Sequence, residues 1–180
     1  GYRFWQKIER IRGLLRRGRR EAHADFWMVW TRAWHAPFSW WKYLFWSERF
    51  ETDPSARRQI LEHELAHIRE GHTLDVLFQE ILHLLFWWNP VFYRYKRELR
   101  DVHEYLADAA ALRCSSVRSY GQLLLQQLQL QDNPQLSHAF HSQIKKRIKM
   151  MTKTKSGRRS LWWYLPVMPL LVGLAFALTA

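Results

Sequence analysis

The sequence predicts a mainly helical (α+β) domain with a small β-hairpin and a C-terminal transmembrane helix. Three observations lead to this prediction. A polar stretch at residues 55–70, free of glycine and proline, lies between an Asp-Pro pair and Gly71. Two short aromatic runs, Phe26–Thr31 and Phe38–Trp46, precede it and are typical of strands. The last twenty residues, Leu161–Ala180, carry no charge, and a helix of that length can cross a membrane.

The charge of the chain is concentrated near its two ends. The 180 residues, enough for one domain, carry a formal charge of +12. Arg3–Arg20 holds eight basic residues and one acid, and Lys145–Arg159 holds eight basic residues and no acid. The charge alone could suit a nucleic acid, an anionic membrane surface or an acidic partner, and the 11 tryptophans with the apolar C-terminus suggest contact with a membrane interface. The chain begins with Gly1, which we interpret as the start of a fragment, and its single cysteine, Cys114, fits a reducing compartment.

The first half of the chain is expected to form one basic helix and a hairpin. Tyr2–Arg20 places isoleucines and leucines on one helical face, which favours either a helix on a membrane surface or a solvated linker. Phe26–Thr31 and Phe38–Trp46 are expected to pair as the two strands of the hairpin. An exposed strand next to the polar helix could hold an extended peptide.

The second half is expected to be helical. Asp53 and Pro54 predict an N-cap and first turn, and Gly71 predicts the end of that helix. Thr73–Trp88 is apolar on nearly every side but too short to span a bilayer, so it is either buried or dips into the membrane interface. Further helices are expected at Val91–Leu112, Val117–Gln131 and His141–Met151.

The polar helix contains the pattern His-Glu-x-x-His. His63 and His67 are four residues apart, so they share one helical face and can bind one metal ion. Glu64 can then act as general base on a metal-bound water, as in zinc proteases. The metzincin extension of this pattern is excluded, because Glu70 and Thr73 stand where it needs glycine and histidine.

A catalytic zinc needs a third protein ligand. Glu104, on a later predicted helix, is the best candidate, and Glu98 and His103 compete with it. Asp108 lies one turn beyond Glu104 and could orient a ligand imidazole, or form an ordinary salt bridge. The other histidines have no partner spacing and are interpreted as structural or solvated: His72, His83, His138 and His141.

Several motifs follow one another at familiar distances along the chain. They are His63–His67, Arg69–Asp75, Trp87–Pro90 and His103–Asp108, with Pro37–Ser39 before them and Ile144–Met151 after them. In combination they resemble the BlaR/MecR-type family of integral-membrane zinc metallopeptidases, in the branch common in Bacteroidetes. The resemblance covers the chain from about Asp25 to its end.

This resemblance implies a gluzincin-like zinc metalloprotease domain. It implies Zn²⁺ held by His63, His67 and Glu104, with Glu64 as the base. It also implies a multi-pass protein of the bacterial inner membrane, in contact with membrane lipid. The two basic clusters lie on either side of the metal motif, and because basic residues near membrane helices stay in the cytoplasm, the protease domain is expected on the cytoplasmic side. An additional sensor domain is expected beyond residue 180. The substrate is expected to be a cytosolic, repressor-like protein, or the chain itself, cleaved in signal transduction.

Two alternatives stay open at this stage. The chain could be a membrane protease for protein processing or quality control, or a non-catalytic signalling scaffold; direct nucleic-acid binding is not expected. The sequence does not identify the group that stabilises the oxyanion, for which His103, Tyr105 and His72 are candidates. The expected organisation is a basic juxtamembrane segment (1–24), a zinc metalloprotease domain (25–140), a second basic juxtamembrane segment (141–160) and a transmembrane helix (161–180).

Overall fold

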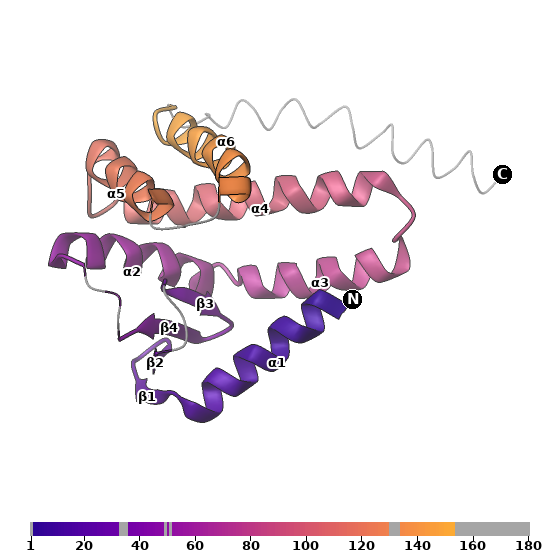
Figure 1. Cartoon of the computed structure of the whole chain (residues 1–180), viewed down its shortest axis with the longest axis horizontal. Helices are drawn as coiled ribbons and strands as arrows, with labels where there is room; N and C mark the ends of the chain where they lie inside the picture. Colours follow the sequence, from indigo (N-terminus) through magenta and orange to yellow (C-terminus); the bar gives the residue numbers. More distant parts are fainter. Residues whose placement is uncertain (1, 33–35, 49, 51, 130–133, 154–180) are drawn as a thin grey trace.

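The computed structural model of the chain describes residues 2–32, 36–48, 50, 52–129 and 134–153. Most of this part is helical, and a small sheet lies to one side of the helices (Figure 1). The elements are α1 (Tyr2–Arg17), β1 (Arg19–Ala22), β2 (Trp27–Thr31), β3 (Phe38–Trp40), β4 (Tyr43–Ser47), α2 (Pro54–Arg69), α3 (His72–Leu85), α4 (Pro90–Ala111), α5 (Val117–Gln129) and α6 (Pro134–Met151). The mainly helical α+β class is therefore confirmed.

The four strands form one sheet in the order β1-β2-β4-β3. The expected pairing of the two aromatic runs as one hairpin is wrong, because Phe38–Trp46 is itself folded into the antiparallel pair β3–β4. The first run, β2, pairs with β4 in parallel. The turn between β3 and β4 has no glycine, and Trp41 takes a left-handed φ of 55° there. Its backbone N–H donates to Thr73 Oγ1 at 2.9 Å, which anchors the turn to the start of α3.

The two faces of the sheet are covered by different helices. The apolar side of α1 packs on one face, where Ile11, Val29 and Phe45 form a buried cluster. The helix expected in Tyr2–Arg20 is present as α1, so this segment is not a solvated linker. Its apolar face packs against the sheet and is not open to a membrane. The other face contributes Leu44 and its neighbours to the main core, which it shares with α2, α4, α5 and α6.

The caps predicted for α2 are confirmed. Asp53 Oδ1 accepts hydrogen bonds from the backbone N–H groups of Ser55 (2.8 Å) and Ala56 (3.0 Å), and Pro54 is the first helical residue. Gly71 ends the turn after α2 with a φ of 69°, a conformation that glycine adopts at little cost. This turn directs the chain immediately into α3.

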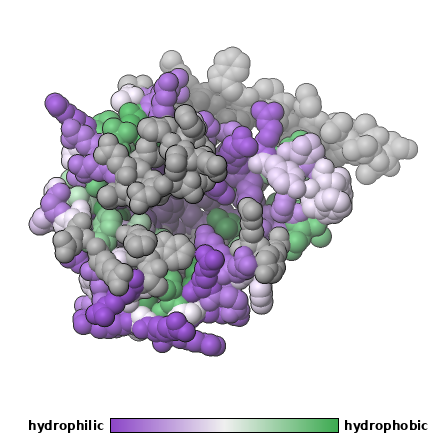
Figure 2. All heavy atoms as spheres, in the orientation of Figure 1, coloured by the Kyte–Doolittle hydropathy of each residue, from purple (hydrophilic) through white to green (hydrophobic). Residues whose placement is uncertain are grey.

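Helix α3 has an unusual distribution of side chains for a helix of a folded domain. Large apolar residues at helical spacing on one side are more than half exposed: Leu74, Phe78, Ile81 and Leu85. The buried residues of α3 are instead polar, His72 and Gln79. Figure 2 shows green and pale surface at the end of the α3–α4 hairpin, at the right of the view. Of the two expectations for Thr73–Trp88, burial is therefore wrong for its large apolar side chains.

The last two helices, α5 and α6, pack together beside the C-terminal half of α4 (Figure 1). Asn89 caps α4, accepting a 3.0 Å hydrogen bond from the backbone N–H of Val91, and Pro90 begins the helix as predicted. Ser116 Oγ accepts from the backbone N–H of Ser119 at the start of α5. Helix α6 begins at Pro134, seven residues before the predicted His141.

None of the described helices is long and apolar enough to span a bilayer. The segment predicted to do so, Leu161–Ala180, lies outside the described residues.

Candidate metal centre

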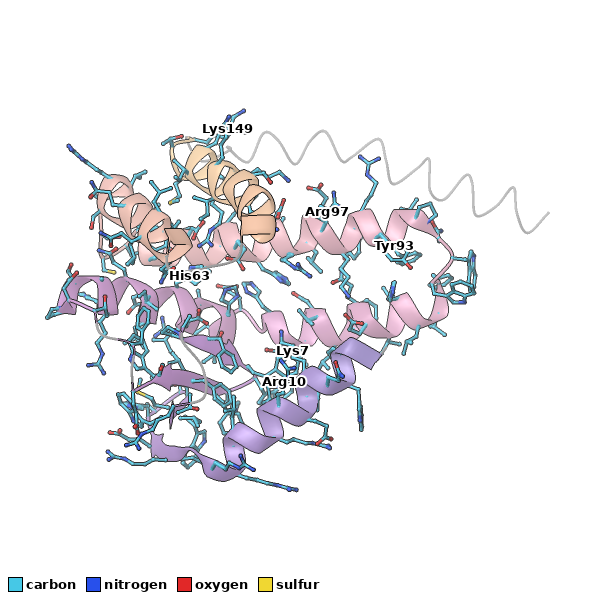
Figure 3. All side chains as sticks on the ribbon, viewed as in Figure 1. Lys7, Arg10, His63, Tyr93, Arg97 and Lys149 are labelled. Carbon is cyan, nitrogen blue, oxygen red and sulfur yellow. The ribbon has the colours of Figure 1, made fainter. Side chains whose placement is uncertain are left out.

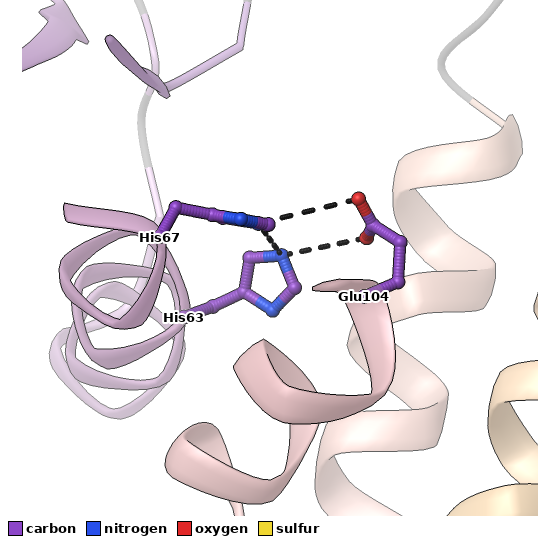
Figure 4. Close-up of side chains that lie close together, drawn as sticks. All are labelled: His63, His67 and Glu104. Atoms are coloured by element: carbon purple, nitrogen blue, oxygen red, sulfur yellow. Dashed lines mark hydrogen bonds and ion pairs between the residues drawn. The ribbon is translucent and has the colours of Figure 1, made fainter. Parts of the chain in front are cut away.

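Three side chains converge between α2 and α4. His63 and His67 project from adjacent turns of α2, and Glu104 faces them from α4 (Figure 4). The Nε2 atoms of the two imidazoles are 3.3 Å apart. Glu104 Oε2 lies 3.6 Å from His63 Nε2, and Glu104 Oε1 lies 4.0 Å from His67 Nε2. One ligand atom from each residue falls within 4.8 Å of the others, a spacing that allows one ion to reach all three.

The protonation of His67 fits metal binding. Burial, and next the nearby His63, lower the pKa of His67 to about 2. The imidazole is therefore neutral at physiological pH and has a lone pair available for a metal. Two neutral imidazoles and a carboxylate are the ligand types that zinc prefers, with one position left open. The residues present therefore fit a catalytic zinc.

A buried network orients His63. Its Nδ1 lies 2.9 Å from the hydroxyl of Tyr120, which donates a 2.9 Å hydrogen bond to Asp108 Oδ1. Asp108 Oδ1 is also 3.4 Å from His63 Nδ1. Burial opposes ionisation of Asp108, but hydrogen bonds from His63 and Arg147 outweigh it and hold its pKa at about 2. An anion on the Nδ1 side favours the tautomer that leaves Nε2 free for a metal.

Arg147, on α6, joins this network to the third candidate ligand. Its Nε donates to Asp108 Oδ2 at 2.9 Å, and its Nη1 lies 3.1 Å from Glu104 Oε2. Its Nη2 contacts both Asp108 and the Tyr120 hydroxyl. The sequence analysis missed Arg147 and Tyr120, because both are far along the chain from the histidines. One guanidinium therefore fixes two carboxylates of the site at once.

A row of rings supports His67 from the other side. Its Nδ1 lies 2.7 Å from His72 Nδ1, at the first residue of α3. The His72 ring stacks on His103 with centroids 3.9 Å apart, and His103 Nε2 lies 2.9 Å from Asp75 Oδ2. When His67 binds a metal through Nε2, its Nδ1 donates to His72, whose own proton is then on Nε2. This buried Nε2 has no hydrogen-bond partner among the described residues.

The other expected candidates lie elsewhere. His103 is engaged with Asp75 and is not part of the converging group. Glu98 is exposed on α4 and is not part of it either. Of the two expectations for His72, structural or solvated, the structural one holds: His72 is buried, and the turn at Gly71 brings it back onto His67. His67 and His72 are five residues apart with Gly71 between them, and this spacing does not predict a contact between the two rings.

Glu64 lies in the same cleft as the converging side chains. Its carboxylate accepts hydrogen bonds from the hydroxyl and the backbone N–H of Ser39 on β3. Burial raises the pKa of Glu64 above its ordinary value, against the effects of His63 and Ser39. The cleft, about 660 Å³ in volume, is lined by β3, the start of α1, α3 and α4, and includes His67 and Glu104. A carboxylate that can exchange a proton thus lies beside a metal-binding group in an open cleft.

Comparison with known proteins agrees with this geometry. The family model of the BlaR1 peptidase M56 matches residues 14–151, which include the whole site. No curated protein and no solved structure matches the chain. The match extends over more than half of the chain and contains the His-Glu-x-x-His pattern, Glu104 and Asp108. The chain therefore belongs to the BlaR1 peptidase M56 family, whose members are zinc metallopeptidases.

Proposed function

We propose that the chain is a zinc endopeptidase in which His63, His67 and Glu104 hold Zn²⁺ and Glu64 is the general base. The observation that supports this most strongly is the convergence of two imidazole nitrogens and a carboxylate within 4.8 Å. Glu64 lines the same cleft and follows His63 directly in the chain.

The chemistry follows from the roles of these groups. Bound zinc supplies Lewis-acid chemistry, lowering the pKa of water and polarising the carbonyl of the scissile peptide. Glu64 accepts the proton of the attacking water and later delivers it to the nitrogen of the leaving amine. The two hydrogen bonds from Ser39 keep the Glu64 carboxylate in position. Asp108 and Tyr120 keep the proton of His63 on Nδ1, away from the metal.

Strand β3 is the part of the fold best suited to position a substrate. It is an edge strand, with β4 on one side and the cleft on the other. Its three residues, Phe38, Ser39 and Trp40, all line the cleft. An extended peptide placed alongside this edge would lie next to Glu64 and pair with main-chain groups of β3 other than the Ser39 N–H, which already donates to Glu64.

The wider role that we propose follows the family. The full-length protein would be a multi-pass protein of the bacterial inner membrane, with this domain on the cytoplasmic side. It would cleave a cytosolic, repressor-like protein, or itself, in signal transduction. The basic composition of α1 and α6 is compatible with nearby anionic lipid headgroups.

Metal analysis and a cleavage assay together test the enzyme proposal. We expect about one zinc per chain in the wild type and in Glu64→Gln, and cleavage of a peptide mixture reduced at least about a hundredfold in Glu64→Gln. Glu62→Gln is the matched control, since Glu62 lies on the same helix and pairs with Arg69. Full zinc content in a His63→Ala, His67→Ala double variant would refute the site. Wild-type cleavage by Glu64→Gln would refute the role of the base.

A further inference from the structure

The cleft extends beyond the metal centre, between α3 and α4. Its far part is lined by charged side chains from three helices: Lys7 on α1, Glu80 on α3, and Lys96 and Arg100 on α4. Figure 3 labels Lys7 on α1, where that helix passes α3. We call Lys7, Lys96 and Arg100 the basic end of the cleft. None of these residues is used by the proposed hydrolysis.

The positive charge at the basic end is only partly neutralised. Glu80 is the carboxylate of this part of the lining, and it forms an ion pair with Lys96. Among the described residues, no carboxylate forms an ion pair with Lys7 or Arg100. Lys7 lies over the ring of Trp40, 5.6 Å from its centroid. Lys7 is exposed, but partial desolvation in the cleft, followed by repulsion from Arg100, lowers its pKa, and the nearby Glu80 acts in the opposite direction. Two cations therefore face the cleft with no described carboxylate in ion-pair contact, an arrangement that an incoming anion would stabilise.

The distances along α4 from Glu104 to Arg100 and Lys96 show how far the basic end lies from the metal centre. Arg100 precedes Glu104 by one helical turn, and Lys96 precedes it by two turns. At 1.5 Å per residue these intervals are about 6 Å and about 12 Å along the helix axis. An extended peptide advances about 3.3 Å per residue. A peptide lying along the cleft with its scissile bond at the metal centre thus brings residues two to four positions away to the basic end.

We propose that the basic end of the cleft binds an acidic side chain of the substrate, two to four residues from the scissile bond, with Arg100 and Lys7 as its partners. This rests on the proposed function in one respect, that the cleft holds a peptide substrate. The preferred substrate class is then a protein segment with an aspartate or glutamate at that spacing. A neutral segment would leave the charges of Lys7 and Arg100 uncompensated and would therefore bind more weakly than an acidic one.

Peptide binding tests this inference without requiring catalysis. The probe is a set of fluorescent octapeptides with one Asp moved along a neutral sequence, with Asn and Lys at the same positions, measured by anisotropy on the zinc-loaded Glu64→Gln chain. We expect the Asp peptide to bind about three- to tenfold more tightly than the Asn peptide at one or two positions, and the Lys peptide more weakly. The preference should fall as salt is added.

Substitutions on α4 locate the effect. Arg100→Gln should reduce the Asp-over-Asn preference to less than about twofold, whereas Arg97→Gln should leave it intact. Arg97 is an exposed residue of the same helix that does not line the cleft, and Figure 3 labels it on α4. Arg100→Glu should invert the preference toward the Lys peptide, a gain that misfolding cannot produce.

The outcomes separate this inference from the proposed function. Equal affinity for Asp and Asn peptides at every position would overturn the acidic preference, even if the wild type cleaves all of them. An Asp preference that depends on Arg100, with no cleavage of any peptide by the wild type, would uphold the binding site and refute the peptidase. An Asp preference that persists in Arg100→Glu would also overturn the assignment to the basic end.

Discussion

The two histidines of the metal centre lie one turn apart on α2 but have very different supports. His63 is oriented by a buried, charged network that α4, α5 and α6 supply through Asp108, Tyr120 and Arg147. His67 is oriented by His72, a neutral ring whose neighbour His103 is held by the half-exposed Asp75. Two identical side chains of one motif can thus depend on a tertiary charge network or on a local row of rings.

The difference has an energetic consequence. In the network behind His63, each charge is compensated by the others, so removal of one member leaves a buried charge without its partner. In the row behind His67, removal of one ring takes away a hydrogen bond and packing but exposes no charge. Substitutions on the His63 side should therefore cost more than those on the His67 side.

Asp108→Ala tests the strongest expectation. Asp108 is 1% exposed and neutralises Arg147 while orienting His63. Its removal should lower the free energy of unfolding by about 3–5 kcal/mol and weaken zinc binding by about 10–100-fold. Urea unfolding of the zinc-free chain and competition with a zinc chelator measure the two effects. A zinc affinity equal to that of the wild type would leave Asp108 as an ordinary salt-bridge partner.

Arg147→Met removes the charge at the other end of the network. Asp108 keeps its contacts with Tyr120 and His63, so the loss should be smaller, about 2–3 kcal/mol in the free energy of unfolding. Zinc affinity should also fall, because Glu104 loses its contact with the guanidinium. The matched control is Lys146→Met on the same helix, whose half-exposed ammonium pairs with Asp101. Equal unfolding curves for Arg147→Met and Lys146→Met would contradict the expectation that the network behind His63 contributes more to stability than a half-exposed ion pair.

His72→Phe should have the smallest effect. Phenylalanine keeps a ring against His103 but cannot accept the hydrogen bond from His67 Nδ1. Zinc affinity should fall by about tenfold or less, with little change in stability, because no buried charge loses its partner. The same chelator competition provides the measurement. A loss as large as that of Asp108→Ala would show that the two supports are equivalent.

The parts of the molecule that the sequence predicted are local. The start of α2 is predicted by Asp53 and Pro54, and the shared face of the two histidines is predicted by their spacing of four residues. Both signals lie within one short segment of the sequence. Glu104 could be selected as a candidate because it lies on a predicted helix one turn before Asp108. The choice among Glu104, Glu98 and His103 was open from sequence; the packing of α4 on α2 and α3 brings Glu104 to the two histidines.

The parts that the sequence did not predict depend on tertiary contacts. Tyr120 is 57 residues from His63, and Arg147 is 39 residues from Asp108, so no periodic pattern connects them. The parallel pairing of β2 with β4 was hidden because the turn at Trp41 lacks glycine and is held by Thr73 instead. The polar inner side of α3 contradicts the rule that large apolar residues mark the buried face.

The position of Arg147 on α6 also affects how the site forms during synthesis of the chain. A ribosome that has reached Gln129 has already made Glu64 and all three candidate ligands, but no part of α6. Asp108 and Glu104 contact Arg147, so they have no guanidinium partner until α6 has been synthesised. Because a domain generally folds as a unit, the site is expected to reach its final geometry only after α6 is available.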